Sequence, residues 1–236
     1  MSVLLRLRPF SNLALFGRKL YSGKDAFKKS SSDEDDKSPR CVSDIDDDFH
    51  DECRDDNLAN PLINSKVQAV INEQINRELN AAYTYLSVSH YFARSNVALL
   101  GFSKWYKEMS KEETEHANML AEYLLQRNGY VELHTLKKPP CICWNNLNIT
   151  FDETIRMENC ISESLSNVYH VATKYQDPMT ADFIVNQFFR EQIDGIRQLN
   201  LLQTRWRTLQ KAPDGIFRLD REIVRRLNRD KISSSR

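Results

Sequence analysis

Glu113 and His116 are the two residues whose types and spacing most clearly could do chemistry. They stand three positions apart in the stretch KEMSKEETEHANML. The apolar row that begins at Phe102 and Met109 steps through both of them to Leu120, so both are predicted to face a helical core. A carboxylate in such a place must be paired, hydrogen-bonded, protonated or bound to metal, because an unpaired buried ion costs on the order of several kcal/mol.

The same anomaly recurs in three other segments. Glu78 lies on one helical face with Ile75, Glu158 continues another apolar row, and Gln192 lies between apolar residues of a fourth. Alone, Glu-x-x-His indicates an ion pair or a satisfied core histidine more often than a metal site. Three carboxylates and one imidazole from three helices of one bundle instead favour a carboxylate-bridged di-iron centre. Glu113 is the candidate bridge, so that both irons give electrons to one dioxygen.

Tyr85 is a further candidate on the inward face of the first helical segment. It lies about two turns beyond Glu78. From the residues alone, two interpretations stay open: a core aromatic, or a hydrogen-bonding neighbour of the metal ligands.

Four long helical patterns must position these residues. Their apolar residues recur at spacings of three and four over residues 65–93, 100–127, 147–175 and 180–209. The fourth pattern is expected to turn one apolar face inward, formed by Val185, Phe188, Leu199, Leu202 and Trp206. The stretch 130–144 contains Pro139-Pro140 and predicts an extended crossover long enough to run the length of a bundle. A shorter pattern, 216–227, predicts a fifth helix, so the expected fold is all-α, a four-helix bundle with one long crossover and a short C-terminal helix.

The charges are segregated along the chain although they cancel overall. Lys+Arg and Asp+Glu both number 33 in 236 residues, and no apolar run is long enough to span a bilayer, so we expect a soluble protein with no membrane segment. Residues 1–24 are basic and lack acids, which predicts a mitochondrial transit peptide and a matrix location, with cytoplasmic or secreted protein as alternatives. Residues 25–60 read as an acidic disordered linker, and 229–236 as a disordered tail.

At these residues the sequence resembles the ferritin family, and within it the catalytic heavy-type chains, with the amino terminus of a mitochondrial one. The resemblance covers about residues 60–227 and is carried by INRELNAAYTYLSVSHYF, KEETEHANML, KKPPCICW, MENCISESL, ADFIVNQFFREQIDGI and KAPDGI. It implies that residues 61–228 form a ferritin-like di-iron domain. It also implies an iron-oxidising centre made of Glu78, Tyr85, Glu113, His116, Glu158 and Gln192.

In that family pattern, Glu78, Glu113 and His116 would hold one iron. Glu113 would bridge to a second iron held by Glu158, with Gln192 and Tyr85 hydrogen-bonding nearby. The implied activity is oxidation of Fe(II) by dioxygen, followed by storage of the ferric mineral inside a hollow shell of 24 subunits, homomeric or mixed, with no nucleic-acid partner. The alternatives are a non-catalytic light-type storage subunit and a DNA-protecting mini-ferritin.

Three departures concern the route of iron rather than its oxidation. Asp182 matches one acid of the family's iron-access pore, whereas Val185 stands where a second acid is usual. Glu112 and Glu115 match an acidic cavity cluster for mineral nucleation, whereas Asn118 replaces its third acid. The fifth helical pattern is also more charged than the family pattern. Because Val185 replaces an acid, we expect weaker attraction of cations at the pore.

Overall fold

The computed structural model describes residues 62–140 and 144–234, with side chains described up to residue 228. The expected transit peptide and acidic linker, residues 1–24 and 25–60, lie outside the described residues. Within the described part every regular element is helical, which confirms the all-α prediction. No helix in this part of the chain is both long and apolar enough to cross a membrane.

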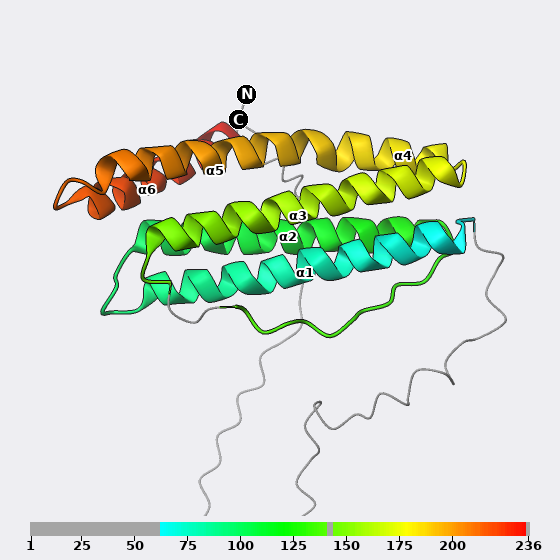
Figure 1. The fold of residues 1–236 in the computed structure, drawn as a ribbon, viewed down its shortest axis with the longest axis horizontal. Helices are drawn as coiled ribbons and strands as arrows, with labels where there is room; N and C mark the ends of the chain where they lie inside the picture. Colours follow the sequence, from blue (N-terminus) through cyan, green and yellow to red (C-terminus); the bar gives the residue numbers. More distant parts are fainter. Residues whose placement is uncertain (1–61, 141–143, 235–236) are drawn as a thin grey trace, which may run out of the picture. The chain divides into compact units, whose positions relative to one another are not determined.

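Four long helical rods run side by side (Figure 1). Three of them are single helices: α1 (Ser65–Ala93), α2 (Leu100–Gln126) and α3 (Leu147–Lys174). The fourth is continuous but composite, with α4 (Pro178–Ile184), η3 (Val185–Phe189) and α5 (Arg190–Leu209). A further helix, α6 (Gly215–Ser234), follows a short turn. The predicted four-helix bundle with an additional C-terminal helix is confirmed.

Short polar side chains define where the helices begin. Asn64 accepts a hydrogen bond from the Lys66 amide before α1, and Asn146 accepts one from the Asn148 amide before α3. The α2 helix has no cap of its own. Its Phe102 amide instead donates to the Asp220 carboxylate of α6 at 2.9 Å, so α6 supplies the missing cap from a distant part of the chain.

Aromatic side chains fill the bundle interior toward the end where α1 finishes and where α2 and α3 begin. Tyr85, Tyr106, Phe92 and Phe102 are all fully buried, and their rings contact one another in a chain across α1 and α2. Phe102 continues the contact to Phe151 of α3. Large rings of this kind contribute much of the buried apolar area, so they hold the helix faces on which the candidate ligands lie.

The long crossover runs beside α1 (Figure 1) and is held by an asparagine ladder, defined as Asn72, Asn76 and Asn80. Asn72 donates to the Tyr130 carbonyl at 3.2 Å and accepts from the Glu132 amide at 3.0 Å. Asn76 donates to the carbonyl of His134, and Asn80 accepts from the amide of Lys137. These bonds satisfy the backbone of an extended segment that has no strand partner.

The fourth rod contains a π-helical turn, Val185–Phe189. Because a π turn holds more residues than an α turn, side chains four positions apart stay close to one face. Ile184, Phe188 and Gln192 are accordingly all buried. Val185 is 41% exposed, so the expectation that it lies on the inward face is wrong, and the widened turn is the physical reason.

The C-terminal helix α6 is longer than the sequence pattern suggests. It continues to Ser234, past the expected end at Leu227, so residues up to 234 that were assigned to a disordered tail belong to the helix instead. Its inner face packs into the core through Leu219 and Ile223, which are 0% and 2% exposed. No Gly or Pro follows Leu227 to end the helix, and this is why it continues.

Candidate metal centre

Three ligand-type side chains meet between α1 and α2. Glu78 of α1 and the α2 residues Glu113 and His116 each offer one ligand atom, and these atoms lie within 4.8 Å of one another. All three side chains are buried, at 0%, 4% and 6% exposure. The two α2 residues are one turn apart, and the His116 Nδ1 lies 3.0 Å from the Glu113 Oε2. The structure thus brings together a Glu-Glu-His group that could hold a metal ion.

Glu158 of α3 forms the opposite half of the centre. The Tyr85 hydroxyl donates to its Oε1, and the Gln192 amide of α5 donates to its Oε2 at a longer 3.4 Å. Tyr85 is therefore a hydrogen-bonding neighbour of a candidate ligand as well as a core aromatic. All six sequence-predicted centre residues lie in the bundle interior, but Glu158 is not part of the tight Glu-Glu-His group.

Burial and mutual repulsion raise the pKa values of the centre's carboxyl groups. Burial raises the pKa of Glu78 well above its usual range, and the neighbouring Glu113 carboxylate adds to the shift. The pKa of Glu113 is raised by burial and then by Glu158. Burial raises the pKa of Glu158 to about 7, although its hydrogen bond from Tyr85 opposes the shift. In the part of the chain that the structure describes, no Lys or Arg forms an ion pair with these three acids.

His116 is the one basic group of the centre. Burial opposes its charged form, but the carboxylates of Glu113 and Glu191 outweigh burial and raise the pKa of His116 well above its usual value. The Glu191 contact places its Oε2 3.6 Å from the His116 Nε2. The Phe188 ring covers the imidazole edge-on at a centroid distance of 5.5 Å. A single imidazolium cannot neutralise three buried carboxylates, so the donor set is suited to an added cation.

Three polar atoms in and beside the centre have no partner. The Glu78 Oε2, the Gln192 Oε1 and the Oε1 of Gln74, which contacts Glu78, are buried without a hydrogen bond in the described structure. Such atoms are costly unless something satisfies them. Carboxylate oxygens and an imidazole nitrogen are the donors that iron, zinc and similar ions accept in proteins, so a metal ion would meet this need.

Gln74 and Glu191 are contacts of the centre that the sequence patterns did not reveal. Gln74 is fully buried one turn before Glu78 and donates to the Glu78 Oε1 at 2.6 Å. Its place on the Ile71 and Ile75 side of α1 was a usable signal, namely another polar residue within an apolar row. Glu191 gave no such signal, because the π turn before it changes the helical phase.

The residues predicted for iron access or nucleation are not members of the Glu-Glu-His group, although Glu112 lies close enough to interact with it. Glu112 is half-buried, and burial together with the Glu113 charge raises its pKa to about 8. Glu115 and Asp182 are exposed. Asn118 and Val185, which replace the acids of the expected pattern, are exposed as well.

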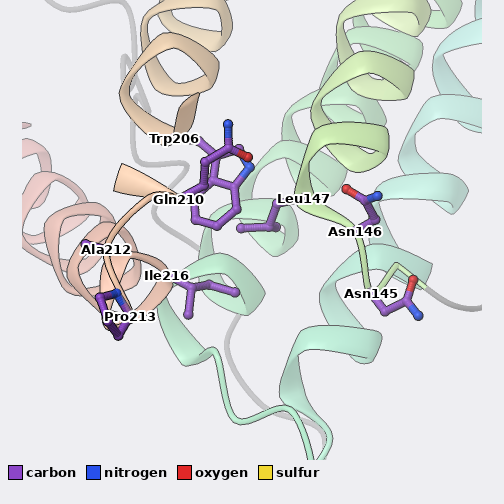
Figure 2. Close-up of a pocket in the computed structure, with 8 residues that line it drawn as sticks. All are labelled: Asn145, Asn146, Leu147, Trp206, Gln210, Ala212, Pro213 and Ile216. Carbon is purple, nitrogen blue, oxygen red and sulfur yellow. The ribbon is translucent and has the colours of Figure 1, made fainter. Parts of the chain in front are cut away.

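A separate hollow of about 540 Å³ opens at the end of the bundle, where α3 begins and α5 meets α6. Figure 2 shows Leu147, Trp206, Gln210 and Ile216 around it. Its lining contains no charged residue and no residue of the Glu78, Glu113 and His116 group. It therefore offers no carboxylate or imidazole ligand for a metal ion, and the carboxylate cluster is the functional candidate.

Comparison with known proteins gives a match over the helical region that contains these residues. Residues 68–209 match the family described as a ferritin-like domain. A chloroplastic ferritin of Malus baccata var. xiaojinensis is 36% identical over 151 residues, which cover 62% of this chain and 60% of that protein. The soma ferritin of Lymnaea stagnalis is 36% identical over 123 residues, 52% of this chain and 71% of that protein.

A third relative is named as a light chain. The oocyte isoform of ferritin light chain from Xenopus laevis is 32% identical over 139 residues, 59% of this chain and 78% of that protein. The chain spans about 60% of the length of the chloroplastic relative. Since the family match covers most of the helical bundle and includes all the candidate ligands, this chain belongs to the ferritin family.

Proposed function

We propose that this chain is a catalytic ferritin subunit, which oxidises Fe(II) with dioxygen and passes the ferric product to a mineral stored inside an oligomeric shell. The observation that carries the proposal is the buried Glu78, Glu113 and His116 group, whose Glu78 Oε2 has no partner. A chain that served only as shell structure would have no need of buried acids without a matching cation, and packed apolar residues would be more stable there.

Iron is the substrate at this centre rather than a resident cofactor. The first Fe(II) would bind at Glu78, Glu113 and His116, and the second would lie between Glu113 and Glu158. The raised pKa values of these carboxyl groups mean that iron binding displaces protons. Each of the two Fe(II) ions would give one electron to the same dioxygen. Because Gln192 offers only a neutral amide on the second side, ferric iron would be held weakly enough to leave.

The experiment measures Fe(II) oxidation by the purified chain at neutral pH in the presence of dioxygen. In Glu113→Ala plus His116→Gly we expect the initial rate to fall by at least about 100-fold, equivalent to about 2.7 kcal/mol in the barrier. A matched control is Asn118→Gly plus Glu122→Ala, which makes similar changes at exposed positions of the same helix. Equal rates in the double variant and the parent would refute the catalytic proposal and favour the light-type storage alternative.

Shell assembly and localisation are part of the same proposal. We expect the mature chain to assemble into a 24-subunit shell, alone or with other ferritin subunits, with Fe(II) and dioxygen as its small-molecule partners. For the amino terminus we expect residues 1–24 to direct a fused fluorescent protein to the mitochondrial matrix, because they are basic and free of acids. A reporter that stays cytosolic or is secreted would contradict the targeting proposal and leave the catalytic one intact.

A further inference from the structure

Gln74 lies directly behind one candidate ligand. It is 0% exposed on α1, one helical turn before Glu78, which is also 0% exposed. Its Nε2 donates to the Glu78 Oε1 over 2.6 Å, at the short end of the range for a hydrogen bond to a carboxylate. The amide orientation follows from the partner, since a carboxylate oxygen accepts and only the amide nitrogen can donate.

This bond makes the two oxygens of Glu78 unequal. Oε1 is held by Gln74, whereas Oε2 is buried and receives no hydrogen bond from an amide, hydroxyl or cationic group; the neighbouring acid of Glu78 is the Glu113 carboxyl. The same carboxylate contributes a ligand atom to the group with Glu113 and His116. A free glutamate side chain samples several rotamers and can bind a metal ion through one oxygen or both. A carboxylate held on one side has lost most of that freedom before an ion arrives.

We propose that Gln74 is a positioning residue that fixes Glu78 as a one-oxygen ligand and keeps its Oε2 available to the first iron. This inference rests on the proposed function, because it concerns the same iron site. The partner of a metal ligand commonly sets the ligand's orientation and basicity, and its loss weakens metal binding by about 10- to 100-fold. Gln74 has that relation to Glu78, although it is not itself a ligand.

The other glutamine of the centre differs in this respect. Gln192 reaches Glu158 at 3.4 Å, and the second oxygen of Glu158 is already bonded to Tyr85. Glu158 thus has both oxygens in use, whereas Glu78 has one bound and one free. Because of this contrast, we expect the first ion to bind at the half of the centre that contains Glu78, where Gln74 already holds the ligand in place.

The test is a Co(II) titration of the full chain, with Co(II) as a spectroscopic substitute for Fe(II). We expect Gln74→Met, which keeps an unbranched side chain of similar length, to weaken the first Co(II) by about 10-fold. We also expect it to change the shape of the Co(II) absorption bands, because Glu78 is then free to bind through both oxygens. The matched control is Gln203→Met, since Gln203 is also buried and donates to the Asp152 carboxylate at 2.6 Å, but far from the centre.

Gln74→Asn is the second variant, because it keeps an amide that is one methylene too short to reach Glu78. It should show the same weakening with a different effect on packing. Unchanged affinity and unchanged bands in both variants, with folding verified by thermal melting, would overturn the Gln74 inference. If instead the parent binds Co(II) no better than Glu113→Ala plus His116→Gly, the proposed function itself fails.

Discussion

Two buried ionic clusters in this chain treat their carboxylates in opposite ways. At the metal centre, the pKa values of Glu78 and Glu113 are raised by burial and by neighbouring acids. At the end of the bundle, Asp177 is also buried, but hydrogen bonds from Arg127 and Thr180 outweigh the effect of burial and lower its pKa. The Arg127 Nη1 lies 2.9 Å from Asp177, and the Thr180 amide lies 3.1 Å from it.

The two clusters differ in whether the chain itself places a cation against the buried acids. Arg127 is a permanent cation that the chain places against Asp177, and it also donates to the Tyr123 hydroxyl and the Leu62 carbonyl, so it ties three segments together. The metal centre has three acids, one imidazole and a partnerless Glu78 oxygen. A buried acid with a fixed cation is a structural element, whereas a cluster short of cations is suited to binding one that comes and goes.

The largest expected difference in stability is between removing the cation of the Asp177 cluster and removing an acid of the metal centre. Arg127→Met leaves Asp177 buried without its cation, so we expect the free energy of unfolding to fall by about 3 kcal/mol. Glu78→Gln removes a carboxylate that has no cation, and we expect the metal-free protein to lose less than about 0.5 kcal/mol or to gain stability. Urea denaturation with a chelator present measures both.

A second measurement compares how far added Co(II) stabilises the parent and Glu78→Gln. Adding Co(II) at about 100 times its dissociation constant should stabilise the parent by about 2.7 kcal/mol and leave Glu78→Gln nearly unchanged. If Glu78→Gln destabilised the metal-free protein as much as Arg127→Met, the two clusters would be alike and the comparison would be lost.

A smaller effect should appear in the pH dependence of the metal-free protein. The folded-state pKa of Glu158 is raised to about 7, so its contribution is fully present below about pH 4.5 and is lost as the pH rises to about 7. The folded-state pKa of Asp177 is lowered, so its contribution is present above the unfolded value of about 3.9 and is lost as the pH falls. Urea denaturation between pH 3 and 8 should therefore show two separate losses.

Each loss should shrink when its own residue is replaced. Glu158→Gln should reduce the loss between about pH 4.5 and 7, by about 3 kcal/mol, and leave the acid side as it was. The loss that remains on the neutral side comes from Glu78, Glu112 and Glu113, whose pKa values burial also raises. Asp177→Asn should lower stability near neutral pH and flatten the acid side. A parent curve that rises steadily from pH 4.5 to 7 would contradict the raised pKa of Glu158.

Sequence reasoning located the helices and selected the candidate centre residues for one physical reason. Apolar side chains must face the core, so a Glu or His in the apolar row is visible as an exception, as with Glu113 and His116. The boundaries predicted for α1 from its apolar spacing agree with the observed helix, Ser65–Ala93, and Asn64 caps its start in the structure. The π turn at Val185–Phe189 was not predictable, since hydrogen-bond register within a helix leaves no mark in residue types.

The contacts between distant segments were also beyond the sequence pattern. Nothing local indicates that Asp220 caps α2, or that Glu191 approaches His116, because both depend on how the packed helices lie against one another. Gln74 was within reach, since it interrupts the apolar row of α1 just as Glu78 does.

The asparagine ladder has a consequence for the permitted length of the crossover. Four residues of helix advance about 6 Å, and two residues of extended chain advance about 6.6 Å. The asparagines recur about every 6 Å along α1, and they meet the crossover backbone in chain order, first at Tyr130 and Glu132, then at His134 and then at Lys137. One residue inserted between Tyr130 and Lys137 would displace the donors from their acceptors, whereas an insertion beyond Lys137 would leave the ladder in register.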